Sequence, residues 1–281
     1  MTMSFKGTPS RRAFLKGAVA AGGTVASAGA ASAAGDPLIT EVQEWASATG
    51  EGVDATPYGL PISYESDVVR RNVEWLTADT ISSINFTPIH ALDGTITPQG
   101  CAFERHHSGA IDLKKEDYRL MINGLVDQPR VFTYEDLERF PRENRVYFCE
   151  CAANTGMEWA GAQLNGAQFT HGMIHNMEYS GIPLRTLLEE AGVQTEGKWV
   201  YVEGADASSN GRSIPLEKAM DDVLVAFKAN GEALRKEHGY PVRLVVPGWE
   251  GNMWIKWLRR IEVTTQAIES REETSKYTDT L

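Results

Sequence analysis

The stretch Arg145-Val146-Tyr147-Phe148-Cys149-Glu150-Cys151-Ala152-Ala153-Asn154-Thr155-Gly156 runs from a strand-like segment directly into small residues. We expect residues 145–150 to form a strand, because aromatic and β-branched side chains lie along it and a turn-forming run ends it. Cys149 and Cys151 are two positions apart, so both thiols would lie on one face of that strand. The small residues that follow allow a ligand to approach the backbone closely. Cys151 therefore stands at the end of a strand, in a position suited to a ligand.

The Cys-x-Cys pattern has three interpretations when it is taken alone. The thiols could be two packed core side chains, part of a metal site, or a redox pair. The chain has only three cysteines, which excludes a disulfide scaffold or a four-cysteine zinc or iron–sulfur site built from this chain alone. A soft metal bound here would need ligands from outside the protein, and a dithiolene cofactor would supply them.

Two further segments carry groups that bind anions. Phe103-Glu104-Arg105-His106-His107 places three donor side chains in a row, with Arg105 able to form a bidentate contact; the alternative is a solvated basic loop. His238-Gly239-Tyr240-Pro241-Val242-Arg243 is followed by a Gly/Pro-rich loop at 247–252 and by Lys256. These cations beside flexible backbone indicate an anion pocket in an acidic protein, and the alternative is a structural loop with surface charges.

The remaining pattern predicts an α+β fold of mixed sheets and short helices. Thr133 and Asp136 resemble a capping box that opens a short helix through Phe140. Leucines at 184, 187 and 188 line one face of a helix that stops at Gly192. Expected strands cover residues 118–124, 198–203, 223–227, 242–246 and 255–263, with an Asn230-Gly231 turn between the third and fourth of these. No G-x-G-x-x-G motif is present, and strands and helices do not alternate regularly.

The amino-terminal end predicts export. Ser10-Arg11-Arg12-Ala13-Phe14-Leu15-Lys16 matches the twin-arginine signal, and a weakly apolar run with an Ala31-Ser32-Ala33 cleavage site follows. A basic tail beside a membrane helix is the alternative, but the run is too short and too rich in glycine to span a bilayer. Because this route exports folded proteins, we expect a periplasmic enzyme whose cofactor is inserted in the cytoplasm. No other long apolar run exists, so we expect no membrane span in the mature chain.

The composition limits the kinds of molecule that this protein is expected to bind. The chain has 281 residues and a formal net charge of −11, which argues against nucleic-acid binding because neutralising phosphates requires an excess of Lys and Arg. No Cys-x-x-Cys-His motif is present for covalent attachment of haem. Any c-type cytochrome that serves this protein is therefore expected to be a separate chain.

Taken together, the segments resemble the molybdopterin domain of the sulfite oxidase family. Within that family the chain is most similar to the molybdenum subunits of the sulfane dehydrogenases of periplasmic thiosulfate oxidation. The resemblance covers residues 89–278 and rests on the order and spacing of short motifs. These are Phe-x-Arg-x-His at 103–107, Glu-Cys-x-x-Asn at 150–154, Glu-Gly-x-Asp at 203–206, Ser-Ile-Pro-Leu at 213–216, His-Gly-Tyr-Pro-Val-Arg at 238–243, Pro-Gly-x-x-Gly at 247–251 and Lys-Trp-Leu at 256–258.

The resemblance implies a molybdenum–molybdopterin cofactor and a role for each matching residue. Cys151 would be the protein ligand of molybdenum, which accepts a soft thiolate. Arg105 and His107 would lie at the cofactor and substrate pocket, with Phe103 beside them. The pterin and its phosphate would be held by Asp206, His238, Arg243 and the stretch Trp254-Ile255-Lys256. Cys149 and Cys101 have no role in the family pattern and are assigned to packing.

Two departures from the family bear on the substrate. Sulfite oxidases place basic residues after Glu-Cys-x-x-Asn, where this chain has Thr155 and Gly156, and they carry a tyrosine shortly before Ser-Ile-Pro, where this chain has residues 210–212. Both changes favour a bulkier, less charged substrate than sulfite, such as a persulfide sulfur on a carrier protein of the thiosulfate-oxidising system. Arg212 is predicted to replace part of the missing positive charge and so to act in catalysis.

The resemblance also predicts the domain organisation. We expect a signal peptide at 1–34, an irregular arm at 35–97, a molybdopterin domain at 98–265 and a tail at 266–281, where the family's dimerisation domain would begin. Whether the chain dimerises without that domain is left open. The expected activity is oxidation of sulfane sulfur with electrons passed to a c-type cytochrome. The alternatives are a free-sulfite dehydrogenase, a reductase of oxidised methionine and a non-catalytic exported remnant of the fold.

Overall fold

A computed structural model of the chain divides into two units, residues Met1–Pro57 and Tyr58–Leu281, and almost all described residues belong to the second. The structure describes residues 60–72, 84–159 and 166–277, together with residues 53, 81, 82 and 161. The predicted signal peptide at 1–34 and the last four residues lie outside this part. Within the expected arm, the described elements are short: η2 (Ser63–Glu65), β1 (Arg71–Asn72) and β2 (Asn85–Phe86). This agrees with an irregular segment.

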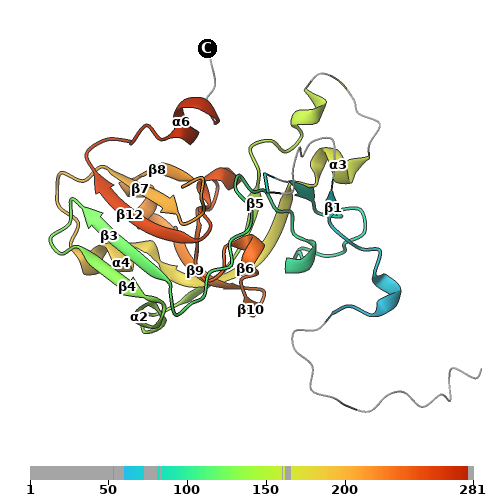
Figure 1. Ribbon diagram of the computed structural model, residues 1–281, viewed down its shortest axis with the longest axis horizontal. Coiled ribbons are helices and arrows are strands. Elements are labelled where there is room, and N and C mark those ends of the chain that lie inside the picture. Colours follow the sequence, from blue (N-terminus) through green and yellow to red (C-terminus); the bar gives the residue numbers. More distant parts are fainter. Residues whose placement is uncertain are drawn as a thin grey trace, which may run out of the picture. The chain divides into compact units, whose positions relative to one another are not determined.

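One five-stranded sheet has the order β4-β3-β12-β7-β8. Its strands are β3 (Arg119–Gly124), β4 (Arg130–Thr133), β7 (Trp199–Gly204), β8 (Gly211–Pro215) and β12 (Leu258–Thr264). The last strand in the chain, β12, lies in the centre, parallel to β3 and antiparallel to β7 (Figure 1). The central strand of this sheet therefore comes from the C-terminal part of the domain.

The second sheet has the order β10-β9-β6-β5, with β11 also paired to β9. Its strands are β5 (Glu143–Glu150), β6 (Ile174–Pro183), β9 (Leu224–Ala229), β10 (Glu232–Ala233) and β11 (Arg243–Val245). The predicted Asn230-Gly231 turn is present, and both residues adopt positive φ, but it joins β9 to β10 rather than β9 to β11. The strand that follows the turn is therefore the two-residue β10, which the hydrophobic periodicity of the sequence does not indicate.

The helices are short and lie at strand ends. They are α2 (Tyr134–Glu138), α3 (Ala167–His171), α4 (Leu184–Ala191), α5 (Leu216–Asp221) and α6 (Arg271–Ser275), with 3₁₀ turns η4 (Gln99–Cys101), η5 (Gly156–Glu158), η6 (Lys236–His238) and η7 (Gly251–Met253). Thr133 and Asp136 form the predicted capping box, although α2 ends at Glu138 and not at Phe140. Gly192 ends α4 in the left-handed conformation, as expected. No helix in the described ranges is both long and apolar enough to cross a membrane.

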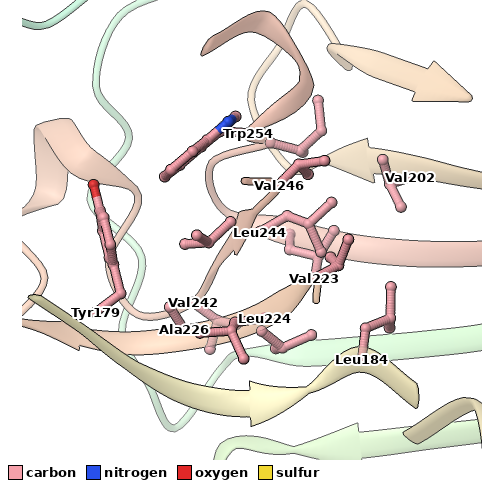
Figure 2. Packing of buried hydrophobic residues seen from close by; sticks show 14 of the residues in the cluster. Tyr179, Leu184, Val202, Val223, Leu224, Ala226, Val242, Leu244, Val246 and Trp254 are labelled. Carbon is pink, nitrogen blue, oxygen red and sulfur yellow. The ribbon is translucent and has the colours of Figure 1, made fainter. Parts of the chain in front are cut away.

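The main core lies between these elements and reaches the aromatic side chain of Trp254 (Figure 2). Strand β9 is buried at five of its six residues and β11 at all three, which confirms that both are interior strands. The predicted strand over 255–263 begins only at Leu258, because Trp257 has a φ of 50° and the chain turns there. The α+β class of mixed sheets and short helices is confirmed.

Candidate active site

Segments far apart in the chain meet around one cavity. The end of β5 provides the two thiols, β6 provides His175, and residues 103–107 provide the donor cluster. The loop after β7, the region from η6 to β11, and the segment from η7 to β12 supply the rest, and a tyrosine after α6 completes the lining. The lining residues are Phe103, Glu104, Arg105, His106, His107, Cys149, Cys151, His175, Asp206, Asn210, Glu237, His238, Arg243, Gly251, Asn252, Trp254, Lys256, Trp257 and Tyr277.

Cys151 is positioned by the loop that follows β5. Its backbone N–H donates to the carbonyl of Met173 at 3.0 Å, and its own carbonyl accepts from the backbone N–H of Asn154 at 2.9 Å. The side chain of Asn154 donates to Glu150 and accepts from the Met173 N–H, so it ties the loop to both neighbouring segments. The small residues after Cys151 therefore form a tight, doubly anchored turn that presents the thiol to the cavity.

The two thiols lie in different environments. Cys149 is 2% exposed and burial raises its pKa to about 12, whereas Cys151 is half-buried. Burial also raises the pKa of Cys151, and a hydrogen bond from the backbone of Ala153 and the charge of Arg105 oppose that rise. Cys151 is thus the more accessible thiol, next to the cation that favours a thiolate. A metal that binds there would displace its proton.

Arg105, His107 and Tyr277 share the half-buried end of the cavity with Cys151. The Tyr277 hydroxyl lies 3.1 Å from His107 Nε2. Burial, together with the nearby charge of Arg105, lowers the pKa of His107 to about 4, so its ring is neutral at pH 7. This end of the cavity therefore combines one permanent cation with neutral hydrogen-bonding groups.

The buried end of the cavity contains Arg243, which is 4% exposed. Its guanidinium donates to the carbonyls of His238 at 3.2 Å and Trp254 at 3.1 Å, and it lies 5.8 and 5.7 Å from the ring centres of Tyr179 and Trp254. Among the described residues no carboxylate pairs with it. A buried cation with only neutral partners is costly and indicates that an anion binds beside it.

Lys256 adds a second basic side chain, which is half-buried. Its ammonium donates to the carbonyls of Arg105 and Glu237, both at 3.0 Å, and lies 2.8 Å from His106 Nδ1. Burial, reinforced by Arg243, lowers the pKa of Lys256 to about 7. An anionic ligand would raise that pKa again, because it favours the protonated amine.

The carboxylate of Glu104 holds His106 in place. His106 Nε2 lies 2.6 Å from Glu104, whose other oxygen pairs with Arg70 at 3.0 Å. Burial opposes ionisation of Glu104, but the His106 hydrogen bond and the Arg70 charge are stronger and lower its pKa to about 2. Burial lowers the pKa of His106 as well, although Glu104 opposes that shift. The chain Lys256–His106–Glu104 thus fixes the floor of the cavity through hydrogen bonds.

Four buried polar atoms on the lining residues have no hydrogen-bond partner among the residues that the structure describes. They are Nδ1 of His175 and His238 and Oδ1 of Asn210 and Asn252. Buried polar atoms are partnered in the great majority of cases, so their concentration in one cavity indicates a bound ligand rich in donors and acceptors. With two basic side chains, those of Arg243 and Lys256, and a thiol, the set fits a phosphorylated pterin that carries a soft metal. Within the described part, no three His, Cys, Asp or Glu side chains form a metal site by themselves.

Most residues proposed from the sequence line this cavity: Phe103, Arg105, His107, Cys151, Asp206, His238, Arg243, Trp254 and Lys256. Ile255 does not; it is 1% exposed and belongs to the core. Arg212 does not line the cavity either, since its guanidinium lies 5.5 Å from the centre of the Tyr277 ring and reaches the site only through that ring. Cys149 belongs to the core, as the packing role predicts, but it also lines the cavity.

Several lining residues are absent from the sequence prediction. Glu104 and His106 lie in the donor segment 103–107, where the sequence gives them no individual role, and Gly251 and Asn252 lie in the Gly/Pro-rich loop at 247–252. The sequence therefore indicates both segments without selecting these residues. His175 and Tyr277 lie in neither segment. They reach the cavity only because β6 pairs with β5 and because the chain continues past β12.

Comparison with known proteins defines the class. Residues 107–272 match the sequence model of the oxidoreductase molybdopterin binding domain, and the chain belongs to this family. Its cofactor is accordingly molybdopterin with molybdenum. The predicted resemblance to the sulfite oxidase family is confirmed.

Individual relatives extend this assignment. The crystal structure of the sulfane dehydrogenase SoxCD from Paracoccus pantotrophus is 75% identical, with a TM-score of 0.83 over 87% of this chain and 63% of that chain. Mitochondrial sulfite oxidase of Mus musculus is 30% identical over 225 residues, which are 76% of this chain and 41% of the relative. Nitrate reductase [NADH] of Solanum lycopersicum is 37% identical over 191 residues, 63% of this chain and 21% of the relative. The chain thus spans only part of each of these proteins.

Proposed function

We propose that this protein is a periplasmic molybdenum oxidoreductase that oxidises sulfane sulfur carried on a partner protein. Its electrons pass to a c-type cytochrome on a separate subunit. The similarity to a sulfane dehydrogenase and to a sulfite oxidase supports an oxidoreductase acting on sulfur. The twin-arginine motif at 10–16 supports export of the folded, cofactor-loaded protein.

The observation that carries the proposal is the cavity itself. The thiol of Cys151 lies half-buried at one end, and the buried Arg243 and the half-buried Lys256 lie among unpartnered polar atoms in the same cavity. Cys151 would bind the molybdenum, and Arg243 and Lys256 would bind the anionic part of the pterin cofactor. When bound, the cofactor supplies two-electron redox chemistry and oxygen-atom transfer to sulfur.

The protein residues orient the substrate and control charge near the metal ligand. Arg105 is the group that would attract a negatively charged sulfur substrate, because it is a permanent cation and interacts electrostatically with Cys151. His107 is neutral at pH 7 and can exchange a hydrogen bond without adding charge. The burial of this site limits the access of water, which strengthens both interactions.

The charge at the half-buried end favours a carried substrate over free sulfite. A small dianion is best bound by several cations, and Thr155 and Gly156 stand where sulfite oxidases have basic residues. Arg212, the nearby guanidinium, is directed against the face of Tyr277 instead of into the cavity. A persulfide on a partner's cysteine needs less positive charge. Free sulfite remains the second candidate, because Arg105 alone can bind an oxyanion.

The first experiment measures molybdenum and pterin in protein folded in the cytoplasm before export. We expect close to one of each per chain, and the absence of both would favour the non-catalytic remnant. The second compares Cys151→Ser with Cys101→Ser, a cysteine outside the cavity, in electron transfer to cytochrome c. Loss of activity in the first variant alone supports the proposal, and an active Cys151→Ser enzyme refutes it. Comparing a persulfide-loaded carrier with free sulfite as reductant then separates the two substrates.

A further inference from the structure

The segment that ends in Tyr277 is firmly attached to strand β8. Ser213 donates its backbone N–H to Glu273 at 2.6 Å, and its hydroxyl accepts from the backbone N–H of Ile268 at 2.9 Å. Ser270 donates its hydroxyl to the carbonyl of Gly211 at 2.7 Å and forms a capping box with Glu273 at the start of α6. Because these contacts join two segments about sixty residues apart in the chain, the position of α6 is set by the sheet.

Tyr277 follows α6 directly and is bonded back to that helix. Its backbone N–H donates to the carbonyl of Glu272 at 2.9 Å. The side chain then enters the cavity, where the hydroxyl lies 3.1 Å from His107 Nε2 and the phenol interacts electrostatically with Cys151 and Arg105. Its hydroxyl is therefore placed among the groups that surround the proposed metal ligand.

Arg212 supports the back of the Tyr277 ring. Its guanidinium carbon is 5.5 Å from the ring centre, Nη1 donates to the carbonyl of Glu272 at 3.2 Å, and Nε lies 3.0 Å from the sulfur of Met253. The contacts to Glu272 and Met253 hold the guanidinium in place, and a cation held over an aromatic face stabilises the position of that ring. Arg212 therefore contacts the same ring whose hydroxyl lies in the cavity.

We propose that Tyr277 is a substrate-binding residue of this site and that Arg212 is a positioning residue that holds its ring. The inference rests on the proposed function and adds a specific contact to it. The hydroxyl is shared with the neutral His107, so the pair can direct one O–H or N–H donor towards an oxygen or sulfur atom of a substrate near Cys151. Such a donor aids binding without adding a positive charge, which suits the weakly charged substrate proposed above.

The test uses the molybdenum-loaded enzyme with the persulfide-loaded carrier as substrate and Tyr277→Phe as the variant. Loss of one buried hydrogen bond should raise KM about tenfold and change kcat less. A binding measurement independent of turnover follows sulfate, an unreactive oxyanion, by calorimetry, and its Kd should rise by a similar factor. Molybdenum content should equal that of wild type. Tyr147→Phe is the matched control, since Tyr147 is half-buried in β5 and does not line the cavity.

Arg212 is tested through a double-mutant cycle. Arg212→Met should reproduce the rise in KM, Arg212→Lys should restore part of the loss because it keeps the cation, and Arg212→Met should have little effect in the Tyr277→Phe background. A purely structural role for Arg212 would give additive losses in both backgrounds and would contradict its assignment.

The outcomes separate this inference from the proposed function. An active wild-type enzyme whose Tyr277→Phe variant keeps the wild-type KM and sulfate Kd would overturn the inference alone. A wild-type protein that contains no molybdenum or oxidises no sulfur compound would overturn the proposed function, and this inference with it.

Discussion

Replacing Arg243 by methionine separates its proposed role in holding the cofactor from its role in the fold. The guanidinium is almost fully buried and makes its hydrogen bonds to main-chain carbonyls. In the cofactor-free protein its desolvation is therefore poorly compensated. Methionine preserves most of the apolar volume between Tyr179 and Trp254 and removes the uncompensated charge, which stabilises the fold. It also leaves main-chain carbonyl groups without a hydrogen-bond donor, which destabilises the fold.

These two effects oppose each other in the cofactor-free protein. We expect the free energy of unfolding of Arg243→Met to stay within about 2 kcal/mol of wild type. In the loaded protein the same change would remove one partner of the buried ion pair that we propose between Arg243 and the anionic cofactor. That loss is worth about 2–5 kcal/mol, which corresponds to about a 30-fold to 4,000-fold weaker binding of the cofactor.

The assay has two parts: urea unfolding of the cofactor-free protein, and molybdenum and pterin content after expression and purification. Arg142→Met is the matched control, because Arg142 also lies over an aromatic ring, that of Phe227, but pairs with Glu138 outside the cavity. Arg243→Met protein that retains its full cofactor content under competition with a metal chelator would refute the reasoning. So would a loss of stability in the cofactor-free protein as large as the loss in binding.

Three further changes test the account. Lys256 has a folded pKa of about 7, below its unfolded value of 10.5, so the unfolded state binds more protons between these two pH values. The free energy of unfolding of the cofactor-free protein should therefore rise as pH increases from 7 towards 10. Lys256→Met should abolish that rise, measured by urea unfolding at each pH. Gly181→Ala would bring a Cβ within 2.7 Å of the Ala226 backbone and should destabilise the sheet by about 1–3 kcal/mol, seen as a lower urea midpoint; an unchanged midpoint would contradict the β6–β9 packing. Thr133→Ala removes the α2 cap and should cost about 1 kcal/mol, whereas Thr195→Ala at an exposed position should cost less than half as much.

Local signals in the sequence predicted the parts of the fold that depend on neighbouring residues. The leucines of α4 and the glycine that ends it, the capping box of α2 and the interior strands β9 and β11 were all predicted with small boundary errors. Each depends on hydrophobic periodicity or on the backbone freedom of a single residue. The errors arose where a tertiary contact overrides the local pattern, as at Trp257, where the chain turns at positive φ before β12 begins.

Some cavity residues could be predicted from short sequence motifs and not from hydrophobic periodicity. Cys151, Arg105 and Arg243 lie in short motifs whose composition already indicates chemistry, so a sequence pattern and a resemblance were sufficient to select them. Tyr277 lies 170 positions from its partner His107 and belongs to no motif. Its place in the cavity follows from the hydrogen bonds between α6 and β8, which only the folded chain reveals. The same contacts explain why Arg212 lies behind a ring and not in the cavity.

The roles proposed for the cavity residues all depend on a bond between the thiolate of Cys151 and molybdenum. X-ray absorption at the molybdenum edge of the loaded protein tests it most directly, with Cys151→Ser and Cys149→Ser compared with wild type. We expect one sulfur neighbour fewer at molybdenum in Cys151→Ser and an unchanged sulfur shell in Cys149→Ser. An unchanged shell in loaded Cys151→Ser protein, or the loss of a sulfur only in Cys149→Ser, would contradict it.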